Sequence, residues 1–266
     1  PYVSNTTSAD GNTKWEYDNY YIIAVEFEAA RTLTRQVLGS LITNFSVGEH
    51  QLGGEIAEVI VYNNALNLSQ RVVVENYLSS KYDIDISGNG LDLYSHESTH
   101  PDGITGIGLF SGASHTAAFS DKILQLSNAS SLDVDQDYLF TGHDGQGISS
   151  WSTTEVPSGV VSLQRLSREW ILDENGDVGT VTFTVDTTLL PARPAGYSLF
   201  VLMVHDDGDF TSGCSVYELL SGGSDQYYSV SGIDVADGQY VAIGSLIPTI
   251  AFSEATVSEF ETEIGR

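Results

Sequence analysis

The chain of 266 residues carries 36 Asp and Glu against 10 Lys and Arg, which gives a formal net charge of −26. This acidic excess argues against nucleic acid and anionic membranes as partners, because both attract positively charged surfaces. Charged residues make up only 17% of the chain and apolar residues 41%, so the composition indicates a folded protein with a hydrophobic core. A cation-rich medium outside the cell, salty or containing calcium, suits such a surface.

The single cysteine and the longest apolar run set two further limits. With only Cys214, the chain has no internal disulfide framework and no zinc or iron–sulfur site built from cysteines. The run from Tyr197 to Val204 is far shorter than the roughly 20 residues of a membrane-spanning helix, so we expect no direct membrane insertion. Because the chain begins at Pro1 without a leader, we expect a mature fragment of a longer polypeptide.

Short runs rich in Val, Ile, Thr, Tyr and Phe, separated by Gly, Asp, Asn and Ser, predict antiparallel strands along most of the chain. The clearest runs are Tyr21 to Phe27, Glu55 to Tyr62, Gly179 to Val185, Ser198 to Val204 and Tyr240 to Gly244. In the run that starts at Gly179, Val181, Phe183 and Val185 alternate with threonines, as in a half-buried strand on one face of a sandwich.

One helix is predicted near residues 68–82, where Asn67 or Ser69 can cap the first turn. The apolar residues that follow at helical spacing are Val72, Val73, Tyr77 and Leu78. The sequence therefore predicts an all-β fold of antiparallel, jelly-roll-like β-sandwich modules with one short helix. A stretch containing Gly, Ser and Asp after the helix predicts a domain boundary near residue 87, and Pro248 marks a second break before a strand at 249–257.

Residues 53–66 read Gly-Gly-Glu-Ile-Ala-Glu-Val-Ile-Val-Tyr-Asn-Asn-Ala-Leu, and the helix after them ends Tyr-Leu-Ser-Ser-Lys-Tyr at residue 82. This stretch resembles the closing segment of laminin-G-like, concanavalin A-like jelly rolls. The resemblance implies a β-sandwich strand followed by a helix that packs on it. A whole domain of that family is longer than residues 1–87, so the resemblance implies that they form its C-terminal part.

Residues 92–247 resemble a second module, which follows such jelly rolls in large bacterial surface proteins. The segments that carry this resemblance are Gly106-Ile107-Gly108, Arg165–Trp170, Gly179–Phe183 and Asp237–Gly244. It implies an extracellular place, secreted or on the bacterial surface, and transfers no catalytic residue. Residues 248–259 resemble the first strand of a Calx-β or immunoglobulin-like repeat. The expected division is therefore 1–87, 88–247 and 248–266.

His96, Glu97 and His100 form an H-E-x-x-H pattern, in which two His one helical turn apart bind zinc and the Glu activates water. The pattern works only on a helix, whereas residues 101–103 read Pro-Asp-Gly and the flanking segments are rich in turn residues. Gly106 stands where the extended motif has a third His. A zinc metallopeptidase is therefore the least favoured of the functions considered.

Acidic turns offer the oxygen ligands that calcium prefers. In the first, Asp173, Asn175 and Asp177 alternate around Gly176, although the distal Glu of a complete EF-hand loop is missing because position 184 is Thr. The alternative interpretation of these residues is a hairpin turn between strands at 170–172 and 180–185.

A second candidate calcium cluster follows an apolar strand and consists of Asp206, Asp207 and Asp209. A solvated loop is its alternative interpretation. A third group of alternating acids is Asp133, Asp135 and Asp137. In an extended strand these three carboxylates would lie on one face, where a bound cation or water would relieve their repulsion.

Neither a G-x-S-x-G elbow nor the carboxylate pattern of jelly-roll glucanases occurs, so we expect no enzyme and no catalytic residue. The favoured function is a structural or adhesive segment of a large extracellular bacterial surface protein or filament, stabilised by calcium. Its partners would be neighbouring domains or copies of the same protein. The alternative is a carbohydrate-binding, lectin-like module. The aromatic residues that suit stacking on sugar rings are Trp15, Tyr17, Tyr20, Trp151, Tyr227 and Tyr228.

Overall fold

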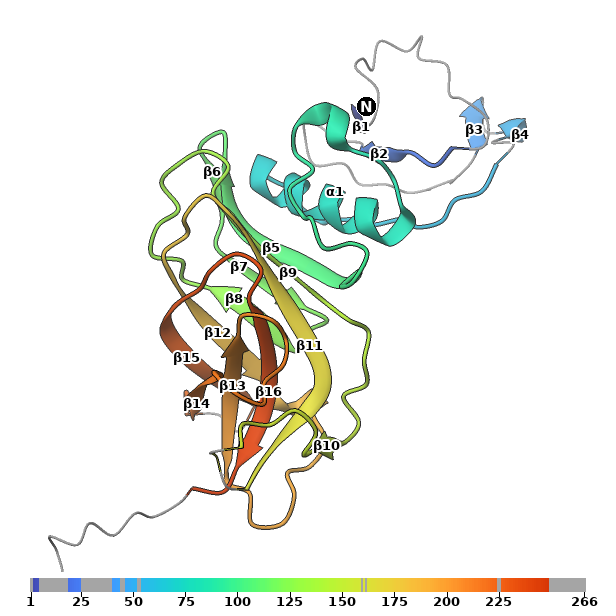
Figure 1. The fold of residues 1–266 in the computed structure, drawn as a ribbon. Helices are drawn as coiled ribbons and strands as arrows, with labels where there is room; N and C mark the ends of the chain where they lie inside the picture. Colours follow the sequence, from blue (N-terminus) through green and yellow to red (C-terminus); the bar gives the residue numbers. More distant parts are fainter. Residues whose placement is uncertain are drawn as a thin grey trace, which may run out of the picture.

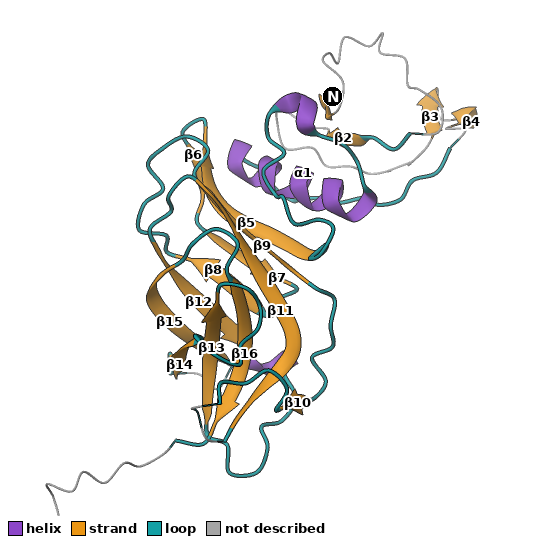
Figure 2. Cartoon of the chain, viewed as in Figure 1, coloured by secondary structure: helices purple, strands orange, loops and turns teal. Residues whose placement is uncertain are grey.

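The computed structural model describes residues 2–4, 19–24, 40–43, 46–51, 54–158, 160, 162–223 and 226–248. Within these ranges antiparallel strands predominate and one α-helix is present, as the sequence predicts (Figures 1 and 2). The strand expected at 249–257 and the aromatic residues Trp15 and Tyr17 lie outside the described residues. The division into 1–87, 88–247 and 248–266 stays a prediction.

Two small antiparallel ribbons precede the helix. β1 (Tyr2–Ser4) pairs with β2 (Ile22–Ala24), and β3 (Ser40–Thr43) pairs with β4 (Ser46–Gln51). Ile22 of β2 is buried in a small cluster with Ile84 and Ile86, which follow the helix. The first ribbon therefore lies at the C-terminal end of the helix.

Twelve strands form one sheet whose neighbours are all antiparallel. They are β5 (Asp102–Phe110), β6 (Ala113–His115), β7 (Ala117–Ser120), β8 (Leu124–Ser127), β9 (Tyr138–His143), β10 (Trp151–Ser152), β11 (Leu163–Asn175), β12 (Thr180–Asp186), β13 (Leu199–His205), β14 (Ser215–Ser221), β15 (Tyr227–Asp234) and β16 (Tyr240–Leu246). Their order is β6-β5-β9-β11-β16-β13-β14-β15-β12-β8-β7, and β10 also pairs with β11.

The sheet folds over on itself into a two-layered, barrel-like sandwich (Figure 1). β14 pairs with β13 in the first layer and with β15 in the second, so the chain turns the corner there. The main core lies between the layers. It is formed by inward side chains such as Leu139, Trp170, Phe183, Leu202 and Ile243, all fully or almost fully buried.

The outer face of the first layer is also covered. Tyr138 and Phe140 alternate with Leu139 along β9 and are buried on the opposite side of the sheet. In β13, Val201 and Met203 likewise join an outer cluster with Phe210. Because both faces are buried, β9 is buried along its whole length, and β13 is a nearly continuous apolar run instead of an alternating one.

The helix α1 (Leu68–Tyr82) has the predicted bounds and begins with a capping box. Asn67 Oδ1 accepts a hydrogen bond from the Gln70 amide at 2.9 Å, and Gln70 Oε1 accepts one from the Asn67 amide at 3.0 Å. Its buried residues Val72 and Val73 pack on the outer face of β5, β9 and β11. The helix therefore covers the sandwich of residues 102–246, although the expected division places it in the preceding module.

The predicted strand from Glu55 to Tyr62 is not present in the structure, which has no regular element there. Val61 is 71% exposed and Ile56 48% exposed. The Val, Ile and Tyr residues of this segment favour a strand, but a strand also needs a neighbour, and none of the described strands pairs with this segment. Glu58 instead accepts hydrogen bonds from Lys81 and Tyr82 and fastens the segment to the helix.

The hairpin expected around Asn175 and Gly176 is also wrong. β11 pairs with β9 and β16, whereas β12 pairs with β8 and β15 in the other layer. The turn between them crosses from one layer to the other. Val178, halfway along this crossing, is fully buried in the core. Burial of this side chain therefore outweighs the local preference of Asn175 and Gly176 for a tight hairpin turn.

Within the described ranges, no helix is both long and apolar enough to cross a membrane.

Candidate functional site

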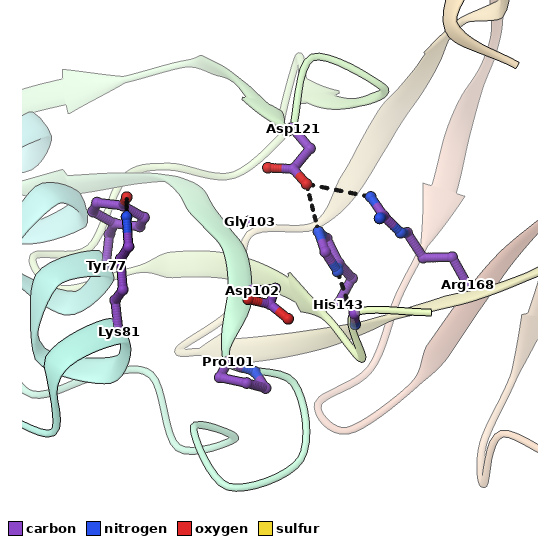
Figure 3. A pocket seen from close by; sticks show the side chains of 9 residues that line it. Tyr77, Lys81, Pro101, Asp102, Gly103, Asp121, His143 and Arg168 are labelled. Carbon is purple, nitrogen blue, oxygen red and sulfur yellow. Dashed lines mark hydrogen bonds and ion pairs between the residues drawn. The ribbon is translucent and has the colours of Figure 1, made fainter. Parts of the chain in front are cut away.

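A pocket of about 340 Å³ lies between α1 and the sandwich (Figure 3). Tyr77 and Lys81 line it from the helix. Across from them, Asp121 in the β7–β8 turn, His143 at the end of β9 and Arg168 in β11 line its other side. The pocket therefore brings together an imidazole, a carboxylate and a guanidinium from three segments.

His143 is the centre of this group and is almost completely buried. Its Nε2 lies 2.7 Å from Asp121 Oδ2, and the Gly145 amide donates to its Nδ1 at 3.1 Å. Because Nδ1 accepts a hydrogen bond, the neutral ring carries its proton on Nε2 and donates it to Asp121. Arg168 adds a second donor to the same carboxylate oxygen at 3.2 Å.

The hydrogen bond from His143 lowers the pKa of Asp121 below the usual value for aspartate, and the charge of Arg168 acts in the same direction. Asp121 therefore stays ionised. Both imidazole nitrogens of His143 are engaged, so the ring can take a proton from a ligand only by giving up its bond from Gly145. In this arrangement the group holds the β7–β8 turn against the end of β9.

A second pocket of about 290 Å³ surrounds Arg165, whose side chain is only 4% exposed. Arg165 pairs with Glu155 and, at 2.6 Å, with Glu169, and its guanidinium lies 4.9 Å from the centre of the Phe210 ring. Burial raises the pKa of Glu169, and the bond from Arg165 opposes this rise. The pocket thus holds an ion-paired network in which one buried guanidinium contacts two carboxylates.

The H-E-x-x-H residues form one hydrogen-bonded turn, in which the His100 amide donates to the His96 carbonyl at 2.8 Å. His100 is buried with its ring edge against Tyr240, and its Nε2 has no hydrogen-bond partner among the described residues. Burial lowers the pKa of His100 and raises that of Glu97. His96, Glu97 and His100 do not form a group of three whose ligand atoms lie within 4.8 Å of one another among the described residues, and the motif lies in a turn and not on a helix.

His96 instead meets two carboxylates from distant segments. Ligand atoms of His96, Asp173 and Asp237 all lie within 4.8 Å of one another. His96 comes from the connection between α1 and β5, Asp173 from the end of β11, and Asp237 from the turn between β15 and β16. Among the described residues, this is the group of three whose side chains lie close enough to share a metal ion.

His96 and Asp173 were both candidate metal ligands from the sequence, but each together with residues close to it along the chain. Asp173 accepts hydrogen bonds from the amide and hydroxyl of Ser95, while Asn175 donates to the Leu93 carbonyl and Asp177 accepts from the Gly179 amide. Each of the three thus binds a different part of the backbone. Their shared role as calcium ligands stays a prediction.

The aspartates of the second acidic turn also bond to separate partners. Asp206 accepts from the Gln239 side chain, Asp207 lies 2.7 Å from His205, and Asp209 accepts from the Thr211 amide. These bonds shape the loop that follows β13. Calcium binding by Asp206, Asp207 and Asp209 also stays a prediction.

The third acidic group is not on a strand, because residues 133–137 form a turn before β9. Asp135 accepts a hydrogen bond from the Ser111 amide and Asp137 one from the Val134 amide. The expected row of three carboxylates on one strand face is therefore wrong.

Sequence reasoning missed Asp121, His143 and Arg168 as a group, and it missed Asp237 as a partner of Asp173. The sequence around Asp121, His143 and Asp237 is turn-like, as in Asp237-Gly238, but such pairs are common and do not say which turn meets which strand. The pairing of β11 with β9 places Arg168 and His143 on neighbouring strands, and its pairing with β16 places Asp173 near the turn that carries Asp237.

Residues 111–239 match a protein family described as a domain of unknown function (DUF8202). The match runs from the turn before β6 to the turn before β16, and so covers most of the sandwich together with Asp173 and Asp237. No curated protein and no solved structure matches the chain. The comparison relates the sandwich to a family and assigns it no activity.

Proposed function

We propose that the chain is a non-catalytic, load-bearing segment of a large extracellular bacterial surface protein, either an adhesin stalk or a filament. The resemblance of residues 53–82 to laminin-G-like domains and of residues 248–259 to Calx-β repeats supports a modular protein. The net charge of −26 suits a surface bathed in a cation-rich medium. Neighbouring domains or copies of the same protein would be its partners.

The observation that carries this proposal is the position of β16. This strand lies in the middle of the sheet, and it pairs with β11 on one side and over its whole length with β13 on the other. A force along the strand must therefore shear two ladders of hydrogen bonds together. Strands of this kind resist pulling better than edge strands that can be opened one bond at a time.

The two ends of the sandwich are also suited to carry load. At one end, α1 is bonded to the β5–β6 hairpin through Ser69, whose hydroxyl donates to the Ala113 carbonyl at 2.7 Å. Gly108 of this hairpin and Asn175, the last residue of β11, both pair with Tyr138 of β9, so they lie at the same end of the sheet. The chain leaves after Leu246, which pairs with Leu163, the first residue of β11 (Figure 1). The 13 residues of β11 separate the two places by roughly 40 Å.

Single-molecule pulling on the full chain tests this proposal. Gly244 lies in the middle of β16, and a Cβ there would come within 2.8 Å of Val201 and 3.1 Å of the Gln164 carbonyl, so Gly244→Ala disturbs both ladders. We expect this variant to unfold at a lower force than the wild type. Gly147→Ala is the matched control, because a Cβ at Gly147 meets nothing within 4 Å. Equal unfolding forces for all three proteins would contradict the proposal.

A second candidate function, glycan binding, has one observation in its favour. Phe119 and Tyr227 are 36% and 41% exposed, and their ring centres lie 6.4 Å apart on the second layer. Two neighbouring exposed rings form an apolar platform of the kind on which sugar rings stack. Binding of the full chain to a glycan array, lost in Phe119→Ala and Tyr227→Ala, would support this function. Binding that both variants retain would exclude this surface.

A further inference from the structure

We propose that His96, Asp173 and Asp237 bind one divalent transition-metal ion, with zinc as the representative ion. This ion would clamp the connection between α1 and β5 to the end of β11 and to the turn before β16. The proposal goes beyond the load-bearing function and does not depend on it.

The first support is the way in which the structure holds each ligand. Asp173 Oδ2 accepts from the Ser95 amide at 2.6 Å and from the Ser95 hydroxyl at 2.9 Å, and Asp237 Oδ1 accepts from the Glu174 amide at 3.2 Å. Each carboxylate thus has one oxygen fixed, while the other has no hydrogen bond from the described residues. Ligands of protein metal sites are commonly oriented by such outer hydrogen bonds.

The second support is the burial of Asp173, which is only 4% exposed. An ionised carboxylate at such a site is costly unless a charge compensates it, and Asp237 nearby adds a second negative charge. A divalent cation between the two carboxylates would offset both charges.

The chemistry of the three ligands selects the class of ion. An imidazole nitrogen and two carboxylate oxygens suit zinc, manganese or iron, whereas calcium is bound by six to eight oxygens. Tetrahedral zinc with bonds of about 2.0 to 2.2 Å places its ligand atoms roughly 3.3 Å apart. The three side chains lie within 4.8 Å, so a small movement of the exposed Asp237 closes the site. Three protein ligands leave a fourth position for water.

The positions of the three ligands along the chain indicate what the ion would do. His96 is separated in the sequence from both carboxylates, and the three segments meet only through tertiary packing. The His96 ring already packs edge-on against Tyr94, whose own amide is held by Asn76 of α1. A metal ion bound here would therefore link the connection that follows α1 to β11 and to the turn between β15 and β16.

Titration calorimetry of the full, metal-free chain with zinc chloride tests the site. We expect one zinc ion per chain and a rise in melting temperature of about 5 to 10 °C when zinc exceeds its dissociation constant a hundredfold. His96→Gln and Asp237→Asn should weaken the binding at least tenfold. Cobalt in place of zinc should give the visible absorption of a tetrahedral nitrogen and oxygen site, which both variants should lose.

Asp173→Asn keeps the shape of the side chain and removes its charge. The amide oxygen of Asn can still accept the hydrogen bonds from the Ser95 amide and hydroxyl, so we expect the metal-free variant to melt close to the wild type. The same variant should bind no zinc. Together these results would separate loss of the ligand from loss of the fold.

Matched controls are His115→Gln and Asp234→Asn, which change the same residue types outside the group. Both should bind zinc as the wild type does. Three outcomes would overturn the proposal: no zinc binding at micromolar concentration, zinc binding that the His96 and Asp237 variants retain, or calcium binding that is tighter than zinc binding and is lost in those variants.

Discussion

At the scale of single residues, the folded chain fixes polar side chains through partners that lie far away in the sequence. His143 and Asp121 are 22 positions apart and form a hydrogen bond of 2.7 Å at the edge of the pocket beneath α1. His96 and Asp173 were both visible as ligand types in the sequence, yet each was expected to act with its immediate neighbours. The reason is general: a local pattern identifies donor atoms, whereas strand pairing decides which donors meet.

Asp121→Asn should lower the free energy of unfolding by about 1 kcal/mol at pH 7, because it weakens charge-assisted hydrogen bonds at a half-exposed site. The folded-state pKa of Asp121 lies below its unfolded value, so its stabilisation is complete above about pH 4 and is lost as the pH falls through the folded pKa. Urea unfolding at pH 7 and at pH 3 measures both effects. A difference between variant and wild type that grows in acid would contradict this assignment.

At the scale of elements, those with strong local signals were predicted closely. The helix was expected near 68–82 and occupies Leu68–Tyr82, because its capping residue and its apolar period agree. The runs that begin at Gly179, Ser198 and Tyr240 correspond to β12, β13 and β16. The run from Glu55 to Tyr62 is likewise rich in Val, Ile and Tyr and forms no strand, since none of the described strands pairs with it. Pairing is the part that one sequence does not reveal.

Asn67→Ala should cost about 1 kcal/mol of stability through loss of the capping box. Asn67 also donates to the Ser114 carbonyl at 2.9 Å, so the variant should loosen the helix from the β5–β6 hairpin as well. Urea unfolding followed by far-UV circular dichroism measures the change. Asn63→Ala is the control and should change stability by less than about 0.5 kcal/mol, because Asn63 is exposed and, among the described residues, its side chain is bonded only to its neighbour Asn64.

At the scale of the whole molecule, a sheet layer that is covered on both faces occurs in a strongly acidic chain. The first layer of the sandwich is buried on both faces, by the second layer and by α1 with the loops that carry Phe210. The chain that folds this way carries a net charge of −26. Composition predicted the acidic, folded character, and the pattern of short strand-like runs predicted the all-β class. It could not predict that the sheet would close on itself, because closure depends on β14 pairing with strands in both layers.

The melting temperature should rise by a few degrees when sodium chloride is increased from 0.1 to 1 M. The screening length falls from about 10 Å to about 3 Å over this range, which reduces repulsion among the acidic side chains. Scanning calorimetry measures the shift. Calcium added at constant ionic strength tests the acidic turns separately, and a further rise would support calcium binding there. A melting temperature that falls with salt would contradict the role of self-repulsion.

If the chain bears load along β16, its unfolding force must depend on the direction of pulling. The full chain is pulled from its two ends, and then between cysteines placed at Gly196 and Pro248, with Cys214→Ser in both proteins. Pulling between residues 196 and 248 separates β13 from β16 beginning at the Leu199–Leu246 pair, so that the hydrogen bonds between the two strands break one at a time. We expect a clearly higher unfolding force for end-to-end pulling. An equal or lower force from the two ends would contradict it.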